Sequence, residues 1–65
     1  MPIPFYAGSM IRNYRAMFLS SQQREFRGSD EQIWEICNTV YDDDGFQDEA
    51  RVLEMLETEP VKDNP

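Results

Sequence analysis

The sequence contains no histidine and only one cysteine. Without histidine, general-base catalysis near neutral pH and most zinc sites lose the residue that usually serves them. Cys37 alone cannot form an intramolecular disulfide, which excludes a disulfide-stapled secreted miniprotein. The three glycines stand singly and form no phosphate-binding loop. We therefore predict no catalytic residue, no cofactor and no metal site, and a protein that is not an enzyme.

Long apolar runs and targeting signals are also missing. The opening residues MPIPFYAGSM have neither a basic segment nor a continuous apolar segment, so we expect no signal peptide. No run approaches the roughly 20 apolar residues that a membrane-spanning helix needs. These features favour a reducing cytoplasm and a protein without a membrane partner.

The 65 residues allow a single domain, residues 1–65. A chain of this length buries only about 60% of the surface that it exposes when unfolded, so a deep cleft is not expected. An apolar content of 40%, with eight aromatic residues, nevertheless argues against general disorder. We expect a minimal folded domain, monomeric, that acts through its surface.

Apolar residues recur at three- and four-residue spacing in three segments, which predicts three helices. We place these helices at about residues 9–27, 30–42 and 46–58, followed by a loose tail at 60–65. No segment shows the alternation of a strand. The predicted fold class is therefore all-α, a small single-domain bundle of three helices.

Capping residues set the predicted helix ends. Ser9 is a candidate N-cap of the first helix, and Gly28 is expected to stop it. Ser29 and Gln32 form a capping box for the second helix. Asp44, with Gln47 three residues later, predicts the start of the third, with Phe46 on its apolar face.

Most aromatic residues are assigned to the core. Phe5 and Tyr6 are expected to pack against the helices as a lid. Trp34 lies beside the apolar stripe of the second helix, where it serves the core or anchors a partner. Cys37 is in phase with this stripe, which predicts a buried thiol.

The net charge of −7 is divided unevenly along the chain. Residues 1–28 have four arginines and one acid, a balance of +3, whereas residues 29–65 have twelve acids against Arg51 and Lys62, a balance of −10. Such asymmetry indicates interaction with a charged partner. Because the excess is negative, we expect a basic protein partner and no direct binding to nucleic acid.

The stretch YDDDGFQDEA concentrates five carboxylates within Tyr41–Ala50. A calcium loop with Gly45 at its sixth position would need ligands where Val40 and Arg51 stand, so it fails. Helix capping explains Asp44 and the acids that follow it. It does not explain Asp42 or Asp43, which the predicted second helix would carry at its unfavourable negative end.

Two explanations of the remaining acids stay open. The first is solubility, which net charge gives to any small domain. The second is a binding surface, since acids three or four residues apart on a helix are about 4.5–6 Å apart along its axis. Duplex DNA carries one negative charge per roughly 1.7 Å of axis, shared between two strands, so the spacings are comparable.

A short, all-helical, strongly acidic chain with a DDDG turn resembles the small phage-encoded inhibitors that imitate DNA. It is most similar to the anti-CRISPR proteins that act on type I surveillance complexes, with type I-C as the nearest system. The resemblance covers the whole chain in size and charge and includes no shared signature motif. It implies an inhibitor that acts in the host bacterial cytoplasm, on the basic surface where such a complex reads the PAM and grips duplex DNA.

The resulting hypothesis is a non-enzymatic, DNA-mimicking inhibitor of a nucleic-acid-binding complex. One alternative is a small adaptor or regulatory protein that binds its partner through an apolar helix face. Another is an antitoxin-like neutraliser of a basic protein. The candidate partner-binding residues are all acidic: Asp30, Glu31, Glu35, Asp42, Asp43, Asp44, Asp48, Glu49, Glu54 and Glu57.

Overall fold

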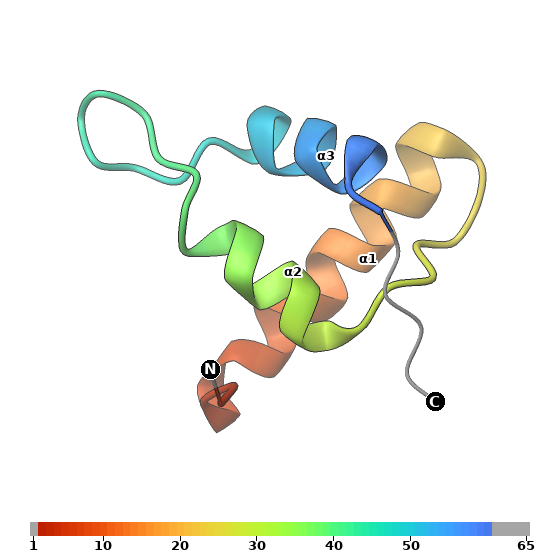
Figure 1. Cartoon of the computed structure of the whole chain (residues 1–65), viewed down its shortest axis with the longest axis horizontal. Coiled ribbons are helices and arrows are strands. Elements are labelled where there is room, and N and C mark those ends of the chain that lie inside the picture. Colours follow the sequence, from red (N-terminus) through yellow and green to blue (C-terminus); the bar gives the residue numbers. More distant parts are fainter. Residues whose placement is uncertain (1, 61–65) are drawn as a thin grey trace.

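The computed structural model describes residues 2–60, which fold into three α-helices preceded by one 3₁₀ turn (Figure 1). The turn η1 spans Phe5–Ala7, and the helices are α1 (Gly8–Gln22), α2 (Asp30–Cys37) and α3 (Glu49–Thr58). Each helix contacts the other two. The prediction of a small all-α domain is confirmed. The predicted tail, apart from Pro60, lies outside the described residues.

The core is built from the predicted apolar stripes. One side of each helix is buried, and Phe26 and Val40 join these stripes from the connecting segments. The buried apolar side chains of the helices are Ile11, Tyr14, Phe18, Ile33, Ile36, Cys37, Val52 and Leu56. The connections lie at opposite ends of the long axis: residues 23–29 at one end and residues 38–48 at the other (Figure 1).

Helix α1 ends at Gln22, so the predicted continuation to Arg27 is wrong. Gln23 adopts a left-handed conformation with φ 58°, and its N–H donates to Leu19 O at 2.9 Å. The chain then turns back, and Phe26 packs edge-on against Phe18 with 5.4 Å between ring centroids. Burying Phe26 requires this turn, because a continued helix would carry the residue past the core.

Helix α2 begins as predicted and ends early. The Ser29 hydroxyl accepts a hydrogen bond from Gln32 N at 3.2 Å, which confirms Ser29 as the N-cap. The helix stops at Cys37 instead of residue 42. Asp42 and Asp43 therefore lie outside the helix, and the argument that they oppose its dipole does not apply.

Helix α3 begins three residues later than predicted. Its N-cap is Asp48, whose carboxylate accepts from Arg51 N at 3.2 Å, so the assignment of Asp44 as the cap is wrong. Phe46, expected on the apolar face of this helix, precedes it and is 71% exposed. The helix ends at Thr58, where the prediction placed it.

The N-terminal aromatic residues do not form a lid. Phe5 is 98% exposed and Tyr6 70% exposed, and their rings pack edge-on against each other with 6.1 Å between centroids. Ala7 is buried in their place. Helix α1 starts directly after it, so the predicted capping role of Ser9 is also wrong. Among residues 2–60, no helix has the length and apolar character needed to cross a membrane.

Candidate functional site

The predicted acidic residues lie on three elements of the structure. Asp30, Glu31 and Glu35 are on α2, the aspartates at 42–44 and 48 are in the connection to α3, and Glu49, Glu54 and Glu57 are on α3. All are exposed except Asp48, which is half-buried at its cap. Only the aspartates at 42–44 come together in one tight turn.

The turn that contains these three aspartates projects beyond the helices at one end of the molecule (Figure 1). Asp42 organises it: its Oδ1 accepts hydrogen bonds from Asp44 N at 3.0 Å and from Phe46 N at 2.9 Å. Backbone bonds from Asp42 N to Phe46 O (2.7 Å) and from Gly45 N to Asp42 O (3.0 Å) close it. Gly45 has φ 85°, a conformation that favours glycine. Asp42 thus has a structural role, whereas Asp43 and Asp44 are exposed acids of the same turn.

Gln47 fastens this turn to the bundle, a role that the sequence did not reveal. Its Oε1 accepts from the Tyr14 hydroxyl of α1 at 2.8 Å, and its Nε2 donates to Cys37 O at the end of α2 at 2.8 Å. Gln47 also pairs with Tyr41 in an isolated antiparallel bridge. Arg51 adds a bond from Nη1 to Tyr41 O at 3.3 Å. The turn is therefore held to all three helices.

Two titratable groups lie behind the turn. Burial is the main reason that the pKa of Tyr14 rises from 10.0 to about 12, and the nearby Cys37, Glu49 and Asp48 raise it further. Burial also raises the pKa of Cys37 from 9.0 to about 11, although a hydrogen bond with Gln47 opposes the rise. The Cys37 side chain is 1% exposed. A buried thiol with so high a pKa is a core residue, as predicted.

Asp30 is the one predicted site residue in an ion pair with another of the described residues. Its Oδ1 accepts from Arg15 Nη2 at 2.6 Å and from Arg15 Nε at 3.1 Å. The same guanidinium donates to Phe26 O at 3.0 Å and Gly28 O at 2.9 Å. Arg15 therefore pins the α1–α2 connection, and Asp30 contributes less free charge than its neighbours.

The remaining acids on the helices face different surroundings. Glu57 accepts a bond from Gln22 Nε2 at 3.3 Å, which places it beside the end of α1. Glu35 lines a hollow of about 270 Å³ between α2 and α3. Glu59, which was not among the predicted site residues, lines the same hollow. Two carboxylates of different elements thus border this shallow depression.

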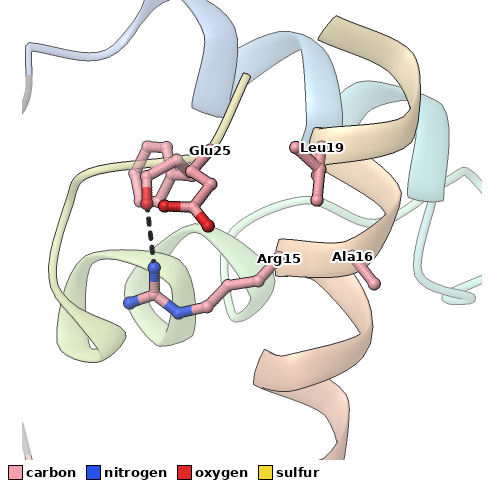
Figure 2. A pocket seen from close by; sticks show the side chains of 5 residues that line it. Arg15, Ala16, Leu19 and Glu25 are labelled. Atoms are coloured by element: carbon pink, nitrogen blue, oxygen red, sulfur yellow. Dashed lines mark hydrogen bonds between the residues drawn. The ribbon is translucent and has the colours of Figure 1, made fainter. Parts of the chain in front are cut away.

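A second hollow, of about 280 Å³, lies where the α1–α2 connection covers α1 (Figure 2). Arg15, Ala16 and Leu19 line it from α1, and Glu25 and Phe26 line it from the connection. Leu19 is 45% exposed here. This hollow is more apolar than the acidic turn, and the α1–α2 connection that borders it lies at the other end of the long axis (Figure 1).

No group of three or more histidine, cysteine, aspartate or glutamate side chains is arranged to hold a metal ion within residues 2–60. Trp34 packs against the core, and its indole Nε1 is a buried atom without a hydrogen-bond partner among the same residues. Comparisons of the chain with protein families, with curated proteins and with solved structures gave no match. Its function is therefore inferred from its own surface.

Proposed function

We propose that this chain is a non-enzymatic inhibitor that occupies the DNA-binding groove of a basic, nucleic-acid-binding protein. The observation that carries this proposal is the segregation of exposed charge. Residues 30–60 contain eleven acids and a single cation, Arg51. Among residues 2–60, Asp30 is the only one of these acids whose carboxylate is paired with a cation. So dense an uncompensated charge attracts a basic surface and repels nucleic acid.

The spacing of the acids supports a groove that normally holds DNA. Glu31 and Glu35 on α2, and Glu54 and Glu57 on α3, are separated along the helix axis by about 4.5–6 Å. Each strand of duplex DNA presents a phosphate charge about every 3.4 Å of axis, so the carboxylates are spaced more widely, by less than a factor of two. Exposed carboxylates on two helices and on the projecting turn can therefore meet lysine and arginine side chains arranged for a duplex.

The basic residues support an oriented encounter. Arg24 and Arg27 belong to the α1–α2 connection, at the opposite end of the long axis from the acidic turn (Figure 1). Glu25 in the connection and Glu57 beside the end of α1 offset this positive charge, so the acidic turn is the more strongly charged end and the field of a basic partner favours its approach. The acidic turn would then approach first.

The resemblance to anti-CRISPR proteins supplies the most specific candidate partner. This is the surface on which a type I surveillance complex, with type I-C as the nearest system, reads the PAM and grips duplex DNA. In that case the chain is phage-encoded and acts in the host cytoplasm. An antitoxin-like neutraliser would share these electrostatics and differ in the identity of its basic partner.

The test is capture of a partner from native host lysate on the immobilised chain, with washes at low and then high salt. We expect a DNA- or RNA-handling complex that elutes with salt and that free duplex DNA displaces. D43K/D44K should weaken capture and leave the melting temperature almost unchanged, because neither side chain supports the turn. E25K, a charge reversal at the other end of the molecule, is the control. A partner that resists high salt and ignores DNA would contradict the proposal.

The apolar hollow beside Leu19 favours one alternative, an adaptor that docks a partner's apolar side chain (Figure 2). In that case Leu19→Asp would abolish capture, and D43K/D44K would leave it intact. The inhibitor hypothesis expects the reverse pattern. The same lysate experiment thus separates the two functions.

A further inference from the structure

The projecting turn exposes an aromatic ring that the fold does not use. Phe46 is 71% exposed, although its sequence position suggested a place in the core. Tyr41, on the other side of the turn, is 45% exposed. A small domain has few aromatic rings with which to build its core, and rings of this kind are enriched at the centres of protein interfaces. Phe46 is thus available to a partner.

The ring is held on a backbone that is already ordered. Phe46 makes two hydrogen bonds with Asp42: its N–H donates to the Asp42 carboxylate at 2.9 Å, and its O accepts from the Asp42 N–H at 2.7 Å. The next residue, Gln47, is bonded to Tyr14 and to Cys37. Because the turn is fixed before binding, a partner loses little affinity in ordering it.

The charges around the ring define the chemistry of that partner. Asp43 and Asp44 are exposed in the same turn as Phe46, and residues 41–47 contain no lysine or arginine. The nearest cation in sequence, Arg51, donates to Tyr41 O at the base of the turn. A guanidinium group stacks on an aromatic face and also pairs with carboxylates through its planar fork of donors. A lysine ammonium offers neither the plane nor the fork.

We propose that the turn Tyr41–Gln47 is a docking element for arginine side chains on the surface of a basic protein. The Phe46 ring provides the stacking face, and the carboxylates of Asp43 and Asp44 receive the guanidinium donors. This inference rests on the proposed function for its basic partner and adds the side chain that the partner must present. The proposal also means that recognition of the partner needs the Phe46 ring, in addition to the attraction between opposite charges.

The test is a titration of the ¹⁵N-labelled chain with oligo-arginine and oligo-lysine peptides of equal length, followed by NMR. We expect the arginine peptide to bind about threefold more tightly, the size of effect typical of one exposed cation–π contact, with shifts concentrated at residues 41–47. Phe46→Leu, which keeps an apolar side chain but removes the ring, should lower the preference to the part that the carboxylates supply. Phe5→Leu, at a still more exposed ring outside the acidic turn, is the matched control.

Each result has a defined meaning. Equal binding of the two peptides, or equal loss in Phe46→Leu and Phe5→Leu, would overturn the inference while the acidic-inhibitor proposal could still pass its DNA-displacement test. Conversely, an arginine preference that depends on Phe46, together with a captured partner that ignores DNA, would support the docking element and contradict the inhibitor. Thermal melting of both variants checks that the fold is intact, as expected for two exposed rings.

Discussion

The Tyr14 hydroxyl donates a 2.8 Å hydrogen bond to Gln47 Oε1, which joins the middle of α1 to the connection between α2 and α3. The other end of the same amide donates to Cys37 O. A single side chain thus links three elements that are distant in sequence. This link fixes the position of the acidic turn next to Gln47. The geometry of the turn therefore depends on the core behind it.

Gln47→Ala should lower the free energy of unfolding by about 2 kcal/mol, because it leaves the Tyr14 hydroxyl and Cys37 O without their partner. Tyr14→Phe removes the donor but keeps the ring, so its cost should be about 1 kcal/mol. Urea denaturation of both variants and of the double variant gives the coupling between the two side chains. Additive losses would show that the bond contributes nothing.

Asp42 and Asp43 are adjacent acids that should behave differently. Asp42→Ala removes the acceptor of two backbone N–H groups and should speed amide hydrogen exchange at residues 44 and 46, with a loss of stability of about 1 kcal/mol. Asp42→Asn keeps an oxygen at the same place and should restore most of this protection. Asp43→Ala serves as the control and should leave exchange unchanged. Identical effects of the two alanine variants would contradict the structural role of Asp42.

Arg15 should matter more to stability than the ion pair that it forms. Arg15→Met breaks charge-assisted bonds to Phe26 O and Gly28 O, and we expect a loss of about 2 kcal/mol. Asp30→Asn removes only the carboxylate charge, and because Asp30 is 60% exposed the loss should stay below about 1 kcal/mol. Urea denaturation tests the order of the two variants. A larger loss in Asp30→Asn than in Arg15→Met would show that the ion pair contributes more to stability than the bonds from Arg15 to the two backbone carbonyls.

The helices could be predicted because each carries a strong local signal. The apolar stripes around Tyr14, Ile33 and Leu56 mark the buried faces, and the Ser29 cap marks the start of α2. The early ends could not be predicted in this way. Helix α1 stops at Gln22 so that Phe26 can reach Phe18, a contact between residues on either side of a turn. Tertiary packing decides such an end, and residue preferences favour it only weakly.

The acidic residues of the candidate site were visible in the sequence, but their separate roles were not. The DDDG segment carries the signals of both a helix cap and a turn. The two structures differ in whether a helix follows directly or the chain first reverses direction. The bond from Tyr14 to Gln47 favours the turn, and it spans 33 positions. Gln47 is thereby turned toward the core while Phe46 before it is exposed, and no local pattern contains this contact.

Stability should fall at alkaline pH because the folded chain holds two protons that the unfolded chain releases earlier. Burial raises the pKa of Cys37 from its ordinary value of 9.0 to about 11, and it is the main reason that the pKa of Tyr14 rises from 10.0 to about 12. The folded state therefore binds more protons between these limits, and the free energy of unfolding decreases as pH rises through them. Below about pH 9 the two groups should leave stability independent of pH.

The two contributions can be separated by variants. Cys37→Ala should delay the onset of the decline from about pH 9 to about pH 10, whereas Tyr14→Phe should keep the onset and reduce the slope above pH 10. Urea denaturation at half-unit intervals from about pH 8 to pH 11 measures both profiles. Because each variant is compared with its own stability at pH 8, the packing cost of the substitution cancels. A wild-type chain that remains equally stable up to pH 11 would show that neither group is held protonated by the fold.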